Sequence, residues 1–416
     1  MTTHTFSSLG VAEPLCRALA AENYTHPTPI QARAIPLLLE GRDLLGIAQT
    51  GTGKTAAFAL PILQHLAKPQ LTVAPRGVRA LILAPTRELA VQIGESFATY
   101  GRHTGLRHAV ILGGVSQFAQ VKALARGVDI LVATPGRLLD LAQQRHVRFD
   151  QVSHFVLDEG DRMLDMGFIR DVRKIVALLP KKRQSLLFSA TMPSDVEKLA
   201  HDMLKNPERV EVTPQKVTVD LIDQRVHFVA TAEKKRFLVD LLADPAMSRV
   251  IVFTRTKHHA NRVSDHLESA GVAADAIHGN KSQNARQRAL ERFKSGEVRV
   301  LVATDIAARG IDVDGVTHVV NFELPNEPES YVHRIGRTAR AGAGGIAVSL
   351  VDSSEQGFLR DIEKLTRKPI AVVGTRPAPS HAGQQQKQPK KDARPNEFYA
   401  KKKKKRWRGG GARRAA

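Results

Sequence analysis

The sequence predicts an α/β protein with two tandem domains, each a parallel sheet flanked by helices, followed by a disordered basic tail. Short apolar runs alternate with amphipathic stretches of helical period, which is typical of parallel sheets covered on both faces. This alternation occurs twice along the chain. The 416 residues, 42% of them hydrophobic, can also fill the cores of two or three domains.

The expected strands are the apolar runs of the two series. The first series contains the runs at 43–49, 79–86, 108–114, 129–134 and 154–159, and the second those at 248–256, 298–305 and 317–322. Between them lies a segment with two prolines and no core period, which indicates a linker. We therefore expect an N-terminal domain at 1–206, a linker at 207–224, a second domain at 225–373 and a tail at 374–416.

The charge of the chain points to a phosphate-rich partner. The net charge is +21 and the isoelectric point is near 10.3, which suits nucleic acid first and an anionic membrane second. From residue 374 onward the chain contains 14 lysines and arginines but only two acidic residues. This tail has no apolar period, and its interleaved Phe398, Tyr399 and Trp407 favour RNA or DNA over a merely solubilising role.

The remaining bulk features predict a soluble intracellular protein. Cys16 is the one cysteine, so no disulfide can form within the chain and no multi-cysteine zinc site is expected. The N-terminal residues lack the apolar core of a signal peptide, and no apolar run approaches the roughly 18 residues of a membrane span.

The strongest chemical signal is the stretch AQTGTGKT at 48–55, between a strand-like run and a helical pattern. Backbone N–H groups at the start of a helix cradle phosphates, Lys54 would reach the β and γ oxygens, and Thr55 would bind Mg²⁺. Asp158 and Glu159 follow another apolar strand, and the combination predicts phosphoryl transfer. Gly160, next to the acids, raises the question of whether the site is active, because glycine loosens the backbone.

Nine further strings extend this pattern, and together they make the chain resemble the DEAD-box RNA helicases, with a RhlE-like bacterial pattern. In order they are HPTPIQ (26–31), PTREL (85–89), GG (113–114), TPGR (134–137), SAT (189–191), VFTRT (252–256), QNAR (283–286), ATDIAARGID (303–312) and YVHRIGRTAR (331–340). The resemblance covers roughly residues 6 to 370. It implies two RecA-like domains, ATP and Mg²⁺ as cofactors, and local, non-processive unwinding of RNA.

The resemblance also assigns roles in ATP binding and hydrolysis. Phe6 would stack on adenine and Gln31 would pair with its edge, while Asp158 would hold Mg²⁺ through water and Glu159 would deprotonate the attacking water. The remaining positions that would bind ATP are Thr50, Gly51, Thr52, Gly53, Lys54, Thr55 and Asp312. Arg337 and Arg340 resemble arginine fingers, and His333 would link the nucleotide to RNA. Asn23 and Ala339 stand where the family usually has glycine, and Gly160 where it has alanine.

RNA contacts are implied for a further set, which would grip the sugar-phosphate backbone without reading bases. Its members are Thr86, Arg87, Gly113, Gly114, Thr134, Gly136, Arg137, Arg286, Thr304 and Gly310. Asp161 would contact Ser189 and Thr191 and so couple hydrolysis to duplex opening.

The expected partner is RNA bound without sequence preference, with the ribosome or the RNA-decay machinery as further partners, no membrane, and a monomeric state. The basic run KKKKKR at 401–406 resembles a nuclear signal, but the RhlE-like pattern favours a bacterial cytoplasm. Two other functions stay open from the residues: a DNA-directed ATPase or translocase, and a non-catalytic RNA clamp or annealing protein.

Overall fold

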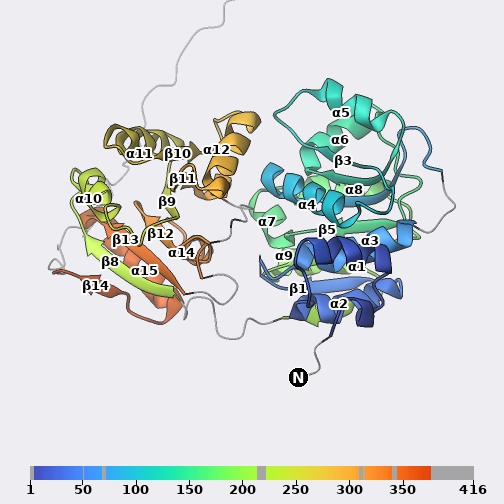
Figure 1. Cartoon of the computed structure of the whole chain (residues 1–416), viewed down its shortest axis with the longest axis horizontal. Coiled ribbons are helices and arrows are strands. Elements are labelled where there is room, and N and C mark those ends of the chain that lie inside the picture. The colour runs from blue at the N-terminus through green and yellow to red at the C-terminus, as the bar shows by residue number, and fades with distance from the viewer. Residues whose placement is uncertain are drawn as a thin grey trace, which may run out of the picture. The chain divides into compact units, whose positions relative to one another are not determined.

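The structure is a computed structural model that describes residues 4–49, 51–67, 72–212, 222–308, 313, 315–339 and 344–375. Most of the expected tail, and residues 213–221 of the expected linker, lie outside this part of the chain. Residues 4–212 build one sheet with its helices and residues 222–375 build another, and we call them lobe 1 and lobe 2 (Figure 1).

Lobe 1 contains a parallel sheet of seven strands in the order β3-β4-β2-β5-β6-β1-β7. The runs expected to be strands supply β1 to β5. The strands are β1 (Leu44–Ile47), β2 (Val78–Leu83), β3 (His108–Ile111), β4 (Val128–Ala133), β5 (His154–Leu157), β6 (Gln184–Ser189) and β7 (Glu208–Glu211). Parallel strands buried on both faces form near-continuous apolar runs, and every residue of β2, β4 and β5 is buried.

Helices cover both faces of this sheet because side chains alternate along each strand. Ala80 and Ile82 of β2 face one core, and Leu81 and Leu83 face the other. The first core takes η1 (Ser7–Leu9), α1 (Glu13–Ala21), α2 (Pro29–Leu39), α3 (Lys54–Ala67) and α4 (Arg87–Tyr100). The second takes α5 (Gln117–Leu124), α6 (Pro135–Gln143), α7 (Gly160–Asp165), α8 (Ile169–Leu178) and α9 (Ser194–Met203).

Lobe 2 repeats this topology, with seven parallel strands in the order β10-β11-β9-β12-β13-β8-β14. They are β8 (Ile222–Phe228), β9 (Val250–Thr254), β10 (Ala274–Ile277), β11 (Val300–Thr304), β12 (His318–Asn321), β13 (Gly345–Val351) and β14 (Ala371–Val373). One face carries α10 (Lys234–Leu241) and α11 (Lys257–Ser269). The other carries α12 (Gln283–Ser295), α13 (Asp305–Ala308), α14 (Pro328–Ile335) and α15 (Gln356–Thr366), with η3 (Ser353–Glu355) before α15.

The two sheets correspond strand for strand, since adding seven to each strand number of lobe 1 gives the order of lobe 2. The predicted fold class, two parallel sheets flanked by helices, is confirmed. Both ends of the expected linker are strands, because β7 ends at Glu211 and β8 begins at Ile222. In parallel α/β sheets, ligands bind beyond the carboxyl ends of the strands, so the loops that follow the strands position the site.

In the described part of the chain, no helix has the length and apolar content required to cross a membrane.

Candidate functional site

The loop expected to bind phosphate lies between β1 and α3 and is held by the start of α2. Thr28 Oγ1 donates to the Thr52 carbonyl at 2.8 Å, and Gln31 Nε2 donates to the Gly53 carbonyl at 3.0 Å. Gly53 has φ +90°, and a Cβ atom there would lie 2.4 Å from Gln31 Nε2. The close approach of α2 therefore requires glycine at this position. Thr50 lies outside the described residues.

Lys54, the first residue of α3, is buried and lacks a hydrogen-bond partner in the described part of the chain. Its Nζ lies 4.0 Å from Asp158 Oδ1, at the outer limit of an ion pair. Leaving a buried ammonium without acceptors is costly, so the position fits an anion that accepts hydrogen bonds. Thr55 follows in the first turn of the same helix, where backbone N–H groups also favour an anion.

The acid pair comes directly after β5, at the same edge of the sheet. Asp158 and Glu159 are 2% and 3% exposed. Burial raises the pKa of Asp158 to about 6, and the nearby Lys54 ammonium opposes that rise. Glu159 has φ +52°, a left-handed conformation that is rare outside glycine and is often found at functional sites. Arg162 of α7 binds the Glu159 carboxylate at 2.7 Å.

Lys54, Asp158 and Glu159 line a cavity of about 460 Å³. Phe6, Gln31 and Thr55 line it as well. Phe6 packs into the core of lobe 1 and is 5% exposed, so little of its ring reaches the cavity. The Gln31 amide oxygen accepts from Thr28 N, and its nitrogen is bound to the phosphate loop. Gln31 therefore holds the loop in this state, and its pairing with adenine stays a prediction.

The structure brings the expected coupling residues together. Asp161 Oδ2 accepts from Thr191 N at 2.9 Å and from Thr191 Oγ1 at 3.0 Å. Ser189 Oγ accepts from Asp161 N at 3.0 Å and donates to the Thr191 carbonyl at 2.7 Å. The acid-pair loop after β5 and the loop after β6 are thereby joined by side chains as well as by the sheet.

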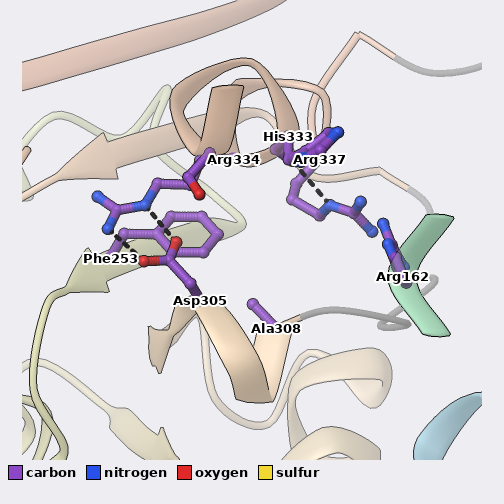
Figure 2. Close-up of a pocket in the computed structure, with 8 residues that line it drawn as sticks. Arg162, Phe253, Asp305, Ala308, His333, Arg334 and Arg337 are labelled. Carbon is purple, nitrogen blue, oxygen red and sulfur yellow. Dashed lines mark hydrogen bonds and ion pairs between the residues drawn. The ribbon is translucent and has the colours of Figure 1, made fainter. Parts of the chain in front are cut away.

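His333 lies in the last turn of α14 in lobe 2, and Arg337 follows two residues after the end of that helix. Arg337 Nε donates to the His333 carbonyl at 3.2 Å. Both residues line a cavity of about 20 Å³ together with Arg162, and Figure 2 shows the Arg337 side chain pointing toward Arg162. Arg340 and Asp312 lie outside the described residues.

Arg334 lies between His333 and Arg337 in the sequence and was not predicted as a site residue. Its contacts indicate a structural role. Its guanidinium binds both oxygens of Asp305, at 2.5 and 2.7 Å, and lies over the Phe253 ring (Figure 2). A buried arginine with these partners anchors α14 to the sheet.

The residues proposed for RNA binding in lobe 1 gather around the loop after β3. Arg87 Nη1 approaches Gly114 so closely that a Cβ there would lie 2.1 Å away, and Gly114 has φ +77°. Arg137 Nη1 donates to the Val115 carbonyl at 3.2 Å. Thr86 caps α4 by accepting from Leu89 N at 3.2 Å. Gly113 follows β3, Thr134 follows β4, and Gly136 is the second residue of α6.

In lobe 2, Arg286 is bound to a carboxylate. Its Nη2 lies 2.9 Å from Glu88 Oε2, and Gln283 Nε2 donates to Glu88 Oε1 at 3.1 Å. Thr304 ends β11 and is 9% exposed. Gly310 lies outside the described residues.

Sequence reasoning missed three positions that the repeated topology reveals. Thr256 caps α11 by accepting from His259 N at 3.2 Å, just as Thr86 caps α4. Lys257 and Gly279 then correspond to Arg87 and to the glycine pair of lobe 1. Both line a cavity of about 410 Å³ together with Thr304. The signal available in the sequence was the repeated order of the strands, because it makes the loops of the two lobes comparable.

In the part of the chain that the structure describes, no group of three or more His, Cys, Asp or Glu side chains could hold a metal ion. A single buried carboxylate beside a phosphate loop fits Mg²⁺, since this ion keeps several waters and uses one or two carboxylates plus substrate phosphates.

Two family models match the chain: DEAD/DEAH box helicase at residues 28–199 and helicase conserved C-terminal domain at 233–342. The ATP-dependent RNA helicase CshA of Geobacillus kaustophilus is 44% identical over 366 residues, covering 88% of this chain and 77% of the relative. CshA of Limosilactobacillus reuteri is 43% identical, covering 87% and 72%. The RhlE-like subfamily stays a prediction.

Solved structures give the same result. S. cerevisiae Dbp5 bound to RNA and ADP BeF3 has a TM-score of 0.78 at 34% identity, covering 89% of this chain and 95% of that chain. Mss116 bound to ssRNA and AMP-PNP has a TM-score of 0.79 at 31% identity, covering 91% and 80%. Because such identity extends over more than two thirds of the relatives, the chain belongs to the DEAD-box ATP-dependent RNA helicases, enzymes that hydrolyse ATP and act on RNA.

Proposed function

We propose that ATP binds in the cavity around Lys54 and that RNA-stimulated hydrolysis drives local, non-processive separation of RNA strands or remodelling of ribonucleoprotein assemblies. The observation that carries this proposal is the buried Lys54 ammonium, which makes no hydrogen bond in the described part of the chain and lies 4.0 Å from Asp158. A γ-phosphate would supply the missing acceptors.

Thr55 and Asp158 are the residues that would hold Mg²⁺, Asp158 through water. Bound there, the ion would neutralise charge on the β and γ phosphates. Phe6 and Gln31 would face the adenine, and backbone N–H groups of the loop 50–55 would bind the phosphates.

Glu159 orients and deprotonates the attacking water in this mechanism. Its left-handed backbone and its bond to Arg162 fix the carboxylate at the sheet edge. Preorganised groups of this kind lower the barrier because they need not reorganise during the reaction. Arg337 and Arg340 would stabilise charge that develops on the γ-phosphate, and Asp312 would help bind the nucleotide. His333 would link that site to RNA, and Asp161 with Ser189 and Thr191 would couple hydrolysis to duplex opening.

RNA would bind along the strand-end loops of both lobes through its sugar-phosphate backbone. Support comes from Arg87 and Arg137, which converge on the loop after β3, and from Dbp5 and Mss116, whose solved structures contain RNA and a nucleotide together. Because backbone contacts carry no sequence information, binding would be independent of sequence. We further propose a monomer in the cytoplasm, with the ribosome or the RNA-decay machinery as partners.

Two variants test the site. We expect Lys54→Ala and Glu159→Gln each to lower the RNA-stimulated kcat by about hundredfold or more, since each removes a group aimed at the reacting phosphate or water. They should differ in binding: Lys54→Ala loses ATP affinity, whereas Glu159→Gln keeps ATP and accumulates a complex with ATP and RNA. Phosphate release and fluorescence-detected ATP binding measure the two effects.

Lys198→Ala is the control, because it removes an exposed lysine from the same lobe. The same assay with single-stranded RNA, single-stranded DNA and duplex DNA separates an RNA-dependent from a DNA-directed ATPase. Near wild-type turnover in either site variant would exclude the proposed roles.

A further inference from the structure

Phe118 is an exposed aromatic residue beside the proposed RNA contacts of lobe 1. It is the second residue of α5 and is 79% exposed, compared with 53% for Leu178 and 51% for Tyr24. Single exposed apolar residues are ordinary on protein surfaces. The inference therefore depends on what surrounds Phe118.

Two guanidinium groups converge on the loop that leads into α5. Arg137 donates to the Val115 carbonyl, and the Arg87 guanidinium lies against Gly114. Phe118 lies three positions after Val115, a stretch of chain that spans at most about 11 Å. The Phe118 ring thus lies within reach of the same RNA segment as the two arginines. Lys122, one helical turn further on, is exposed on the same face of α5 and adds a cation.

The helix that carries Phe118 is fixed to the sheet. Gln120 is buried, its Oε1 accepts from Leu112 N at 3.0 Å, and its Nε2 donates to the Leu112 and Ser116 carbonyls at 3.1 and 3.2 Å. Gln117 Nε2 donates to Gln144 Oε1 beside α6 at 2.6 Å. An aromatic side chain on a fixed element loses little conformational entropy when a ligand binds.

Lobe 2 shows that the fold does not need an apolar residue here. Ser116 precedes helix α5, which starts with Gln117 and Phe118. In lobe 2, Ser282 precedes the corresponding helix α12, which starts with Gln283 and Asn284, so the first two residues are the same and the third differs. Asn284, the counterpart of Phe118, is exposed and polar. Phe118 is therefore a feature of lobe 1 and not of the shared topology.

We propose that Phe118 stacks on an unpaired base of the single-stranded RNA whose phosphates Arg87 and Arg137 bind. The proposal rests on the role of those arginines proposed above. Every base has a π-face, so an aromatic platform next to cations that follow the backbone binds single strands without sequence preference. A duplex keeps its bases stacked inside, so the contact selects RNA that is already separated. Phe118 would hold one strand next to the backbone contacts.

The test uses the full chain with a saturating non-hydrolysable ATP analogue and a single-stranded oligoribonucleotide that contains 2-aminopurine. Phe118→Asn copies the residue of lobe 2, Phe118→Leu keeps an apolar side chain without a ring, and Phe118→Tyr keeps the ring. We expect the Asn and Leu variants to bind RNA about five- to hundredfold more weakly and to lose quenching of 2-aminopurine, while the Tyr variant keeps both. An abasic oligomer of the same length should bind all variants equally.

Leu178→Ala is the matched control, since it removes another exposed apolar side chain of lobe 1 and should leave binding unchanged. Full affinity in Phe118→Leu would overturn stacking and indicate an apolar docking surface. If Arg137→Ala weakens binding but Phe118→Asn does not, the stacking proposal fails and the RNA contacts stand. If neither variant weakens binding, the proposed RNA contacts of lobe 1 fail as well.

Discussion

Lys54 and Lys234 occupy the same position in the two lobes but have different partners. Each is buried and is the first residue of the helix that follows the corresponding strand, β1 in lobe 1 and β8 in lobe 2. Lys54 lacks a hydrogen-bond partner in the described part of the chain. Lys234 binds Glu355, donates to the Phe322 carbonyl at 3.2 Å and lies 3.4 Å from Asp352. Lobe 2 supplies from its own chain the acceptors that, in our proposal, the phosphates of ATP supply in lobe 1.

The loops that precede Lys54 and Lys234 differ in their glycine content. The lobe 1 loop is glycine-rich, QTGTG at 49–53, so its backbone N–H groups can approach phosphate oxygens, whereas the lobe 2 loop, VATAE at 229–233, contains no glycine. After β5, Asp158 and Glu159 face the cavity of lobe 1. After β12, the corresponding residues are Phe322 and Glu323, and Glu323 binds Arg255 N and His259. The same topology therefore carries the proposed ATP site in lobe 1 and an internal ion-pair network in lobe 2.

The largest effect expected from this comparison is on stability. Lys234→Met removes the ammonium that binds the buried Glu355 and Asp352 carboxylates, and breaking a buried pair in this way costs about 3–5 kcal/mol. Arg255 Nη2 stays 3.4 Å from Glu355 Oε1, so we expect the lower end of that range. Lys54→Met should cost at most about 1 kcal/mol, because Asp158 can take up a proton when its pKa is already raised to about 6. Urea unfolding of the full chain gives the free energies, and hydrogen exchange assigns each loss to a lobe.

Equal losses in the two variants would contradict this difference between the lobes. A loss at Lys54 larger than at Lys234 would mean that the Lys54 ammonium is satisfied within the chain, and the argument for a phosphate at that position would fall.

The fold class could be predicted from the sequence because the central strands are continuous apolar runs. The run at 154–159 contains β5, and the run at 248–256 contains β9. The strands β6, β7, β8, β10, β13 and β14 were not among the expected runs, and for β8 the composition gives the reason. It pairs with β13 along all seven of its residues, but its sequence IDQRVHF is mostly polar, with Ile222 and Val226 as its buried residues. A strand with few buried side chains gives no apolar run to recognise.

The site could be predicted as a set of residues but not as a set of contacts. The sequence places Lys54 and Asp158 at strand ends, yet it cannot show that Gln31 holds the Gly53 carbonyl or that Arg286 lies against Glu88. Such pairs depend on side-chain direction in three dimensions. The exposure of Phe118 is likewise a property of the folded surface, and the sequence around it shows only an apolar residue at a helix start.

A second paired effect concerns acid stability. His154 begins β5 and His318 begins β12, and each ring Nδ1 lies 2.9 Å from the hydroxyl of the preceding residue. Burial lowers the pKa of His154 to about 3, helped by His65 and Arg79. Burial also lowers the pKa of His318, but the Asp244 carboxylate opposes the shift. The histidine of lobe 1 should therefore be the more acid-sensitive of the two.

The direction follows from proton binding. In the unfolded chain the histidine binds a proton at a pKa near 6.5, whereas native His154 does not bind one until about pH 3. The unfolding free energy is therefore not reduced by His154 above pH 6.5, and it falls as the pH drops from 6.5 toward 3. At pH 5 the loss is about 2 kcal/mol. We expect His154→Gln to reduce the drop in unfolding free energy between pH 7 and pH 5, and His318→Gln to reduce it less. The reverse order would show that Asp244 does not compensate His318.

The smallest expected effect concerns Gly160, the first residue of α7 and the neighbour of the acid pair. A Cβ atom there would lie 3.5 Å from Leu187 Cδ2 and 3.5 Å from Val196 Cγ1, which is ordinary van der Waals contact. Alanine therefore fits without displacing Asp158 or Glu159. In a helical position glycine costs about 0.5–1 kcal/mol relative to alanine, so Gly160→Ala should raise the unfolding free energy by that amount.

The chemistry should change less than the stability, because a methyl group at Gly160 touches neither the phosphate loop nor the Asp161 contact with Thr191. We expect basal ATP hydrolysis to change by less than about tenfold, equivalent to 1.4 kcal/mol, and unwinding per ATP to rise or stay level. Phosphate release and strand separation measured on the same samples give this ratio, with Gly357→Ala of α15 as a control at an open glycine outside the proposed sites. If the natural chain binds ATP and RNA without hydrolysis and Gly160→Ala restores turnover, Gly160 would mark an inactivated site and the non-catalytic clamp would be the better description.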